Sequence, residues 1–240
     1  MSPCPRTLCE FFWWGSLRST HPTILITGHR PLTTFHSRLR PVQTENHHPQ
    51  AAFLATGTAL LLVDVINDLE FPGGEELLES ARLVAGRIAA LKRHLKSRGI
   101  PAIYVNEAAT RWVPSFSRQV EHCLAAGIRG RPVVETLRPD AADYFVLMPQ
   151  HSPCLLSKLD TLFETLRLKT LIVTGIAASV QARLAANDVY LSGFRFLIPG
   201  DCLASRTDGH TRSVLEYLRA MLGAEVLASS DLMAGFLAGL

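Results

Sequence analysis

From about residue 58 onward, apolar and polar positions follow two alternating patterns. Short continuous apolar runs are typical of strands buried on both faces. Between them lie longer stretches in which apolar residues recur every three or four positions, as on one face of a helix. The runs predict six strands, with the sequences ALLLVDV, PAIYVN, YFVLM, TLIVTG, FRFLIP and AEVLA. The longer stretches predict helices near residues 77–95, 115–126, 155–166, 178–191 and 214–221.

This alternation predicts an α/β fold, with three layers (α-β-α) built around a doubly wound, mostly parallel six-stranded sheet. In sheets of this kind, ligands bind beyond the carboxyl ends of the strands. The candidate functional residues are therefore those at the strand ends, namely Asp64, Asn106, Met148 and the turn over residues 175–181.

Residues 1–55 show neither period and are rich in Pro, His, Thr, Ser and Arg. We expect them to be a disordered or artefactual N-terminal extension, followed by one domain over residues 56–235. The five arginines and two glutamates of the extension account for the whole net charge of +3. The remaining chain is neutral and has no field that would steer it onto nucleic acid, so we expect no nucleic-acid partner.

The five cysteines are scattered and form neither a disulfide framework nor a metal-ligand spacing. We therefore expect no metal, no cofactor and a reducing, cytoplasmic setting. No apolar run reaches the roughly 18 residues that a membrane span requires, so a membrane is not an expected partner.

Five segments carry the candidate chemistry. They are LLLVDVINDLEFPG, AIYVNEAATRW, YFVLMPQHSPC, LIVTGIAASVQARLAANDVYLSGF and PGDCLAS. Their order and spacing resemble those of the isochorismatase-like cysteine hydrolases, which include nicotinamidases, isochorismatases and N-carbamoyl-amide hydrolases. The resemblance extends from about Thr58 to Leu232 and implies the fold of that family.

The family hydrolyses its substrates with an Asp, a Lys and a Cys. The Asp ends the first strand, in a pattern like V-D-x-x-N-D, and corresponds to Asp64. The Lys stands just before a P-x-H-S-A-F-like segment, where this chain has Met148 before PQHSPC. The Cys follows a T-G-[IV]-A turn by four residues, where this chain has Gln181. The resemblance implies that one of three catalytic groups is retained.

The two replacements remove the chemistry of the family mechanism. A thiolate nucleophile is made available by nearby positive charge and a helix N-terminus. The amide of Gln181 is not a usable nucleophile, and the thioether of Met148 carries no charge. The backbone around Ile176 and Ala177 would still supply N–H donors for an oxyanion hole.

The resemblance also indicates residues that line the substrate pocket. Arg111 and Trp112 match the family pattern, whereas Ala108 and Ala109 stand where that pattern has a polar and an aromatic residue. Cys154 replaces the usual aromatic residue after the His-Ser pair. The lining is therefore predicted to be altered together with the catalytic groups.

Three hypotheses follow. The first is a catalytically degenerate member of the family that retains a pocket for a small-molecule ligand. The second is an active hydrolase of an amide, carbamoyl or vinyl-ether compound, with a relocated nucleophile at Cys154 or Ser179. The third is an oligomeric interaction or scaffold protein. The resemblance favours a homo-oligomer.

Overall fold

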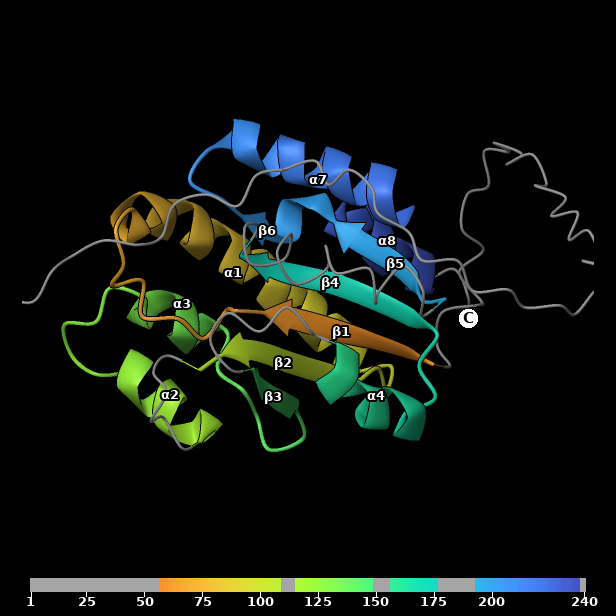
Figure 1. The fold of residues 1–240 in the computed structure, drawn as a ribbon, viewed down its shortest axis with the longest axis horizontal. Coiled ribbons are helices and arrows are strands. Elements are labelled where there is room, and N and C mark those ends of the chain that lie inside the picture. The colour runs from red at the N-terminus through yellow and green to blue at the C-terminus, as the bar shows by residue number, and fades with distance from the viewer. Residues whose placement is uncertain (1–56, 109–114, 149–155, 177–192, 238–240) are drawn as a thin grey trace, which may run out of the picture. The chain divides into compact units, whose positions relative to one another are not determined.

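The computed structural model describes residues 57–108, 115–148, 156–176 and 193–237. Strands alternate with helices along these ranges (Figure 1). The strands are β1 (Thr58–Val63), β2 (Ala102–Glu107), β3 (Tyr144–Met148), β4 (Thr170–Ile176), β5 (Arg195–Pro199), β6 (Leu203–Ala204) and β7 (Glu225–Leu227). The helices are α1 (Gly74–Lys96), α2 (Phe116–Cys123), α3 (Arg131–Thr136), α4 (Leu156–Thr165), α7 (Asp208–Leu222) and α8 (Ser229–Leu237), with a short 3-10 helix, η2 (Gly200–Cys202).

The strands form one sheet in the order β3-β2-β1-β4-β5-β7, and β6 pairs with β4 beyond the end of β5. Each recorded pairing is parallel. The predicted α/β fold with its mostly parallel sheet is confirmed, and all six predicted strands are present. The seventh strand, β6, is two residues long, which is too short to produce a recognisable period.

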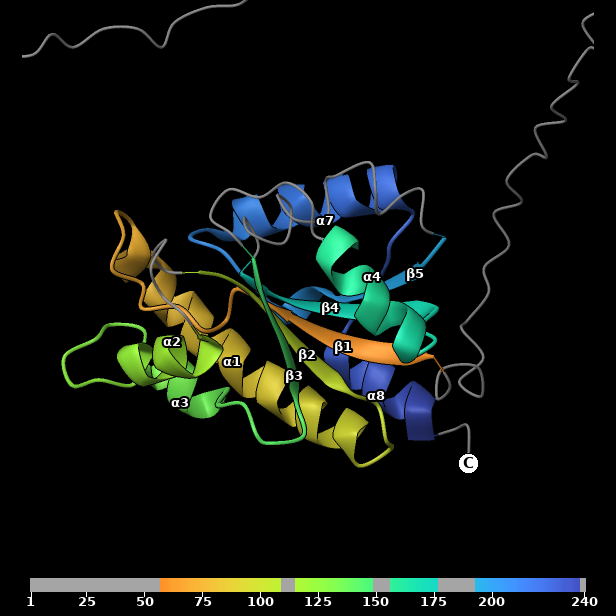
Figure 2. The same cartoon turned by 60° about the horizontal axis from the view of Figure 1, so that its bottom comes forward.

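Helices cover both faces of the sheet, so the molecule has the three predicted layers. α1, α2, α3 and α8 lie on one face, and α4 and α7 lie on the other (Figure 2). The central strand β1 is buried along its whole length. Leu60 and Leu62 pack under α1, whereas Leu61 and Val63 pack on the opposite face. Burial on both faces explains why this strand is a continuous apolar run.

The long helix α1 follows the predicted period. Its buried residues repeat at intervals of three and four, from Leu77 to Leu95. Acidic residues occupy its first turn and basic residues its last, which complements the helix dipole. The helix ends at Lys96, and Gly99 adopts a left-handed conformation with φ 74° just beyond it. The loop between β1 and this helix leads to the candidate site.

Two helices were not predicted. The first, α3, begins at Arg131 in the segment GIRGRP, which contains two glycines and shows no helical period, and it has a proline in its first turn. Proline is favoured there, since its missing N–H would be unpaired in any case. The second, α8, follows β7 and packs against α1.

No helix within the described ranges is both long enough and apolar enough to cross a lipid bilayer.

Candidate functional site

Asp64 directly follows β1 at the carboxyl edge of the sheet. Its backbone N–H donates to the carbonyl of Val105 (2.8 Å), and its carboxylate Oδ1 accepts a hydrogen bond from the N–H of Glu107 (2.7 Å). The residue is 4% exposed and has φ 51°, a left-handed conformation that Asp tolerates better than most residues. The two contacts hold Asp64 between the ends of β1 and β2, one through its backbone and one through its carboxylate.

The loop from β1 to α1 passes very close to the connection between α2 and α3. A Cβ atom on Gly130 would lie 2.0 Å from the carbonyl oxygen of Asn67, so only glycine fits there. The N–H of Gly130 donates to the carbonyl of Asp68 (2.8 Å). This close approach holds the loop against the α2 side of the site.

Two buried amide side chains bind the same backbone oxygen. The Nδ2 atom of Asn106 and the Nε2 atom of Gln119 each donate to the carbonyl of Ile66, at 3.0 and 3.1 Å. Nε2 of Gln119 also donates to the carbonyl of Glu107 (3.0 Å). The amide oxygens of both side chains are buried without a hydrogen-bond partner among the described residues. These two acceptors remain for a donor from water or a ligand.

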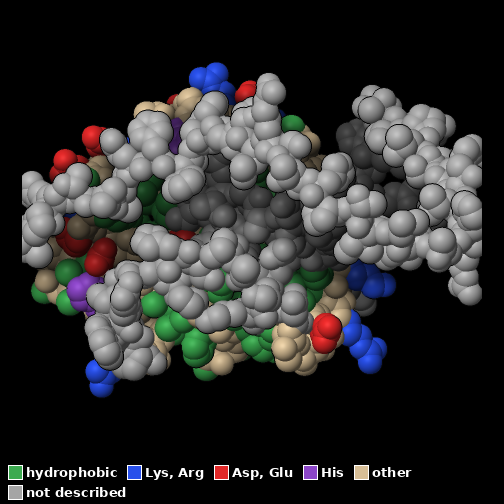
Figure 3. All heavy atoms as spheres, viewed as in Figure 1, with side chains coloured by type: hydrophobic (Ala, Val, Ile, Leu, Met, Phe, Trp, Pro, Cys, Tyr) green, Lys and Arg blue, Asp and Glu red, His purple; other side chains and the backbone are tan. Residues whose placement is uncertain are grey.

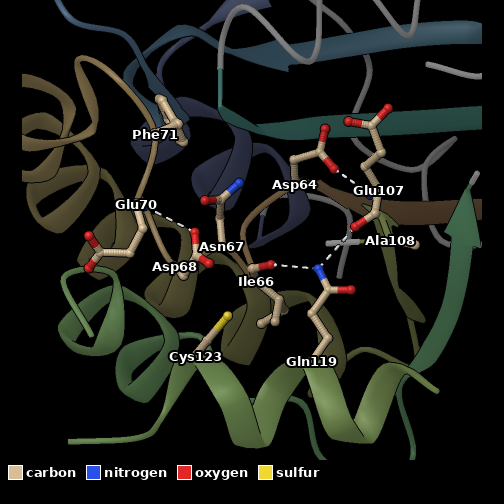
Figure 4. A pocket seen from close by; sticks show the side chains of 10 residues that line it. All are labelled: Asp64, Ile66, Asn67, Asp68, Glu70, Phe71, Glu107, Ala108, Gln119 and Cys123. Atoms are coloured by element: carbon tan, nitrogen blue, oxygen red, sulfur yellow. Dashed lines mark hydrogen bonds between the residues drawn. The ribbon is translucent and has the colours of Figure 1, made fainter. Parts of the chain in front are cut away.

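A cavity of about 400 Å³ opens between these elements. In the close view, Gln119 rises from α2 on one side, Phe71 lies on the other, and the Asp64 carboxylate stands beside Glu107 (Figure 4). Its lining consists of Asp64, Ile66, Asn67, Asp68, Glu70, Phe71, Glu107, Ala108, Gln119 and Cys123. We call this space the Asp64 cavity. Its size falls within the range of small-molecule sites.

The described lining of the Asp64 cavity is acidic, with four carboxylates. Acidic side chains also show on the described surface at this edge of the molecule, at the left of Figure 3. Asp68 lies 3.1 Å from the ring of His122, and Glu70 lies 3.2 Å from the guanidinium of Arg129. An acidic lining disfavours an anionic ligand at this position.

Met148 ends β3 in the row of strand ends that contains Asp64. Its carbonyl accepts a hydrogen bond from the N–H of Ala108 (2.9 Å), and its backbone is in register with Glu107, whose N–H binds Asp64. The side chain is 0% exposed and packs in the apolar cluster of the α4 and α7 face. The structure thus places Met148 two strands from Asp64, with its side chain in the core.

The end of β4 lies on the other side of β1. Gly175 has φ 136°, and a Cβ atom there would lie 2.1 Å from the carbonyl oxygen of Val63. Ile176, one of the two predicted oxyanion residues, is the last residue of the strand and is half-buried. Glycine is therefore required for β4 to approach β1 at the edge where the predicted turn begins.

Within the part of the chain that the structure describes, no three His, Cys, Asp or Glu side chains gather into a metal-ligand set.

A family model described as the isochorismatase domain matches residues 58–231. The chain belongs to the isochorismatase family. The uncharacterised isochorismatase family protein YaaI of Bacillus subtilis (strain 168) is 31% identical over 175 residues, which cover 73% of this chain and 96% of that protein.

Solved structures of this family share the fold. A cysteine hydrolase from Pseudomonas syringae pv. phaseolicola 1448A superposes with a TM-score of 0.60 at 18% identity, covering 78% of this chain and 95% of that one. An N-carbamoylsarcosine amidase from Thermoplasma acidophilum gives a TM-score of 0.52 at 21% identity, covering 72% and 97%. These similarities support the three-layer architecture of this family member.

Several predicted site residues of this isochorismatase-family chain lie outside the described residues. They are Arg111, Trp112, Cys154, Ala177, Ser179 and Gln181. The structure brings Asp64, Asn106, Met148 and Ile176 to one edge of the sheet. Asn106 donates its amide to the backbone of Ile66, and its role in substrate binding stays a prediction.

Sequence reasoning missed Gln119 as a residue of the cavity. Its signal was a polar residue in the buried stripe of α2, three positions after Phe116 and four before Cys123. A glutamine at such a position indicates a specific hydrogen-bonding role, because a buried amide without partners is costly.

Two cysteines are described, and neither has the environment of a nucleophile. Burial, with a smaller contribution from the charge of Asp68, raises the pKa of the Cys123 thiol to about 12. Burial, followed by the charge of Asp201, raises the pKa of Cys202 to about 12. Both thiols are therefore protonated at neutral pH, although Cys123 lines the Asp64 cavity.

Proposed function

We propose that this chain is a catalytically degenerate homologue of the isochorismatase-family hydrolases that retains a pocket for a small molecule. The proposal rests on the resemblance that aligns Met148 with the catalytic Lys and Gln181 with the catalytic Cys. A chain with both replacements has neither the nucleophile nor the cation of the family mechanism.

The environment of Met148 is the observation that supports the proposal most strongly. The side chain is completely buried in an apolar cluster, so this position is used for packing. A thioether in such a cluster provides no positive charge to activate a thiolate. At the same edge of the sheet, the Asp64 cavity of about 400 Å³ supports a retained binding role.

The described cysteines support the same conclusion. The raised pKa values of Cys123 and Cys202 keep their thiols protonated, so neither one substitutes for the missing nucleophile. The alternative of an active hydrolase with a relocated nucleophile then depends on Cys154 or Ser179.

The test is turnover by the purified full-length protein. Suitable substrates are isochorismate and the compounds named for structural relatives, namely N-carbamoylsarcosine, nicotinamide and pyrazinamide. We expect the rate to equal that of the folded variant Asp64→Asn with every substrate. Hydrolysis well above that of the variant would overturn the proposal.

A reversion experiment separates loss of chemistry from loss of the pocket. We expect the double variant Met148→Lys, Gln181→Cys to gain hydrolysis of one of these substrates, and each single variant to remain inactive, because nucleophile and cation act as a unit. A folded double variant that binds none of the substrates would contradict the retained pocket.

The proposed partner is a small molecule. Three further predictions remain. They are that the protein has no nucleic-acid partner, that it works in a reducing, cytoplasmic setting, and that it forms a homo-oligomer.

A further inference from the structure

A second cavity, of about 300 Å³, lies next to the Asp64 cavity, and Phe71 lines both. Most of its wall is apolar, contributed by Phe71, Pro72, Leu77, Ile176 and Ala204. Among the described residues that line it, the polar side chains are Ser205, Arg206 and His210, and none of these is acidic. We call this space the Arg206 cavity. Its charge is opposite to that of the Asp64 cavity.

Arg206 lies between β6 and α7 and packs on the start of α1. A Cβ atom on Gly73, the residue before α1, would lie 2.8 Å from Nη1 of Arg206. No hydrogen bond or ion pair joins this guanidinium to another described residue. Arg206 is exposed, and its guanidinium presents a positive charge with a planar set of donors to the cavity.

Ser205 provides an independent indication of a ligand. The residue is 5% exposed and lines the Arg206 cavity, yet its hydroxyl has no hydrogen-bond partner among the described residues. A buried hydroxyl without a partner lowers the stability of the fold. A ligand acceptor in the cavity would satisfy this donor.

Two helix N-termini also meet this end of the sheet. α1 and α7 both begin at the carboxyl edge, at the left of Figure 1. The positive end of a helix dipole favours an anion. Glu75, Glu76 and Asp208 occupy the first turns of these helices, but they are exposed and are not in the lining of the cavity.

The geometry points to a subsite for the carboxylate of a small organic ligand in the Arg206 cavity. Arg206 supplies the charge, and the Ser205 hydroxyl and the His210 ring donate hydrogen bonds to the carboxylate. The apolar wall from Phe71 to Ile176 covers the hydrocarbon part of the ligand. A single fixed cation within apolar walls matches a singly charged carboxylate better than a phosphate dianion, which requires more donors.

The inference deepens the proposed ligand-binding function and rests on it, because it assigns a chemical class to the ligand. The Arg206 cavity offers a cation to the carboxylate, whereas the charged side chains that line the Asp64 cavity are acidic. A ligand bound in this way directs its neutral end toward the carboxyl ends of β1 and β4.

The experiment compares two probes of nearly equal shape, benzoate and benzamide, by calorimetric titration of the full-length protein. We expect benzoate to bind at least about tenfold more tightly than benzamide, and Arg206→Gln to reduce benzoate affinity by about tenfold, the loss typical of a hydrogen bond to a charged group. The matched control is Arg219→Gln, an exposed arginine near the far end of α7, which leaves the affinity unchanged.

Further variants keep the test decisive. Arg206→Lys retains the charge but not the planar fork, and is expected to lose less affinity than Arg206→Gln. Equal binding of benzoate and benzamide, or equal effects of Arg206→Gln and Arg219→Gln, would overturn the subsite. Displacement of benzoate by inorganic phosphate at equal concentration would overturn its assignment to a carboxylate.

Different results would overturn the proposed function and the proposed subsite. Hydrolysis that depends on Asp64 would overturn the catalytically silent role and leave benzoate binding untouched.

Discussion

At the scale of single residues, the site depends on backbone conformations that most side chains avoid. Gly175 has φ 136° and lies directly against the carbonyl of Val63, and Asp64 has φ 51° at the end of the neighbouring strand. Both residues stand where β1 and β4 reach the carboxyl edge of the sheet. Replacing either residue therefore tests how firmly this edge is held.

Gly175→Ala is expected to lower the free energy of unfolding by about 3 kcal/mol or more. The added Cβ atom would overlap the backbone oxygen of Val63, and alanine is also strained at this positive φ. Gly86→Ala is the control, since it lies on the exposed face of α1 with nothing within 4 Å of the added atom. There we expect a gain of about 0.5–1 kcal/mol. Denaturant unfolding measures both, and similar values for the two variants would contradict the assignment.

Asp64→Ala is expected to be less stable than Asp64→Asn by about 2 kcal/mol. Alanine leaves the buried N–H of Glu107 without its acceptor and is strained at φ 51°, whereas asparagine keeps an oxygen acceptor and tolerates this conformation. Denaturant unfolding of the two variants measures the difference. Equal stabilities would mean that the hydrogen bond to Glu107 contributes nothing.

At the scale of elements, the sequence predicted those whose burial is set by their own periodic pattern. β1 is a continuous apolar run because both of its faces are covered, and α1 shows a stripe at helical spacing. The short helix α3 and the two-residue strand β6 were not predicted, because neither is long enough to show a period. Their positions follow from tertiary contacts of the chain.

Lys96, near the end of α1, ties this helix to the connection before β3 and should make its stability depend on pH. The hydrogen bond from Lys96 to Asp140 (2.5 Å) holds the pKa of Asp140 below its ordinary value of 3.8. A carboxyl group whose pKa is lower in the folded state contributes stability above its unfolded pKa, and this contribution is lost as the pH falls through the folded pKa. Because Asp140 is exposed, the contribution is small.

We therefore expect the unfolding free energy to fall less steeply below about pH 4 in Lys96→Gln than in the unaltered protein. Lys169→Gln, an exposed lysine before β4, should keep the original slope. Denaturant titrations at several pH values give the comparison. Identical slopes in all three proteins would show that the Lys96–Asp140 pair does not stabilise the fold.

At the scale of the whole molecule, the parallel sheet brings strand ends that are distant in sequence to one edge. The sequence located this edge through Asp64, Asn106 and Met148, and family membership confirms the fold around them. The sequence did not predict that Gln119 and Arg206 line cavities at this edge. Each belongs to a part of the chain that is brought to its cavity only by tertiary packing. The order of strands in the sheet likewise depends on contacts between distant segments.

Self-association also belongs to this scale and stays a prediction. β3 is an edge strand of the described sheet, with Tyr144 and Phe145 exposed at 40% and 55%. Light scattering of the purified protein should give a mass that is a multiple of 26.4 kDa. A strictly monomeric protein across concentrations would contradict this prediction.

The measurement that tests the central claim most directly is the hydrolysis of isochorismate, N-carbamoylsarcosine, nicotinamide and pyrazinamide by the full-length protein, with Asp64→Asn assayed in parallel. Met148 is buried in the core, and we propose that Gln181 stands in place of the nucleophile, so we expect equal background rates from the two proteins. Turnover of any one substrate that is well above the rate of Asp64→Asn would contradict the claim that the family chemistry has been lost.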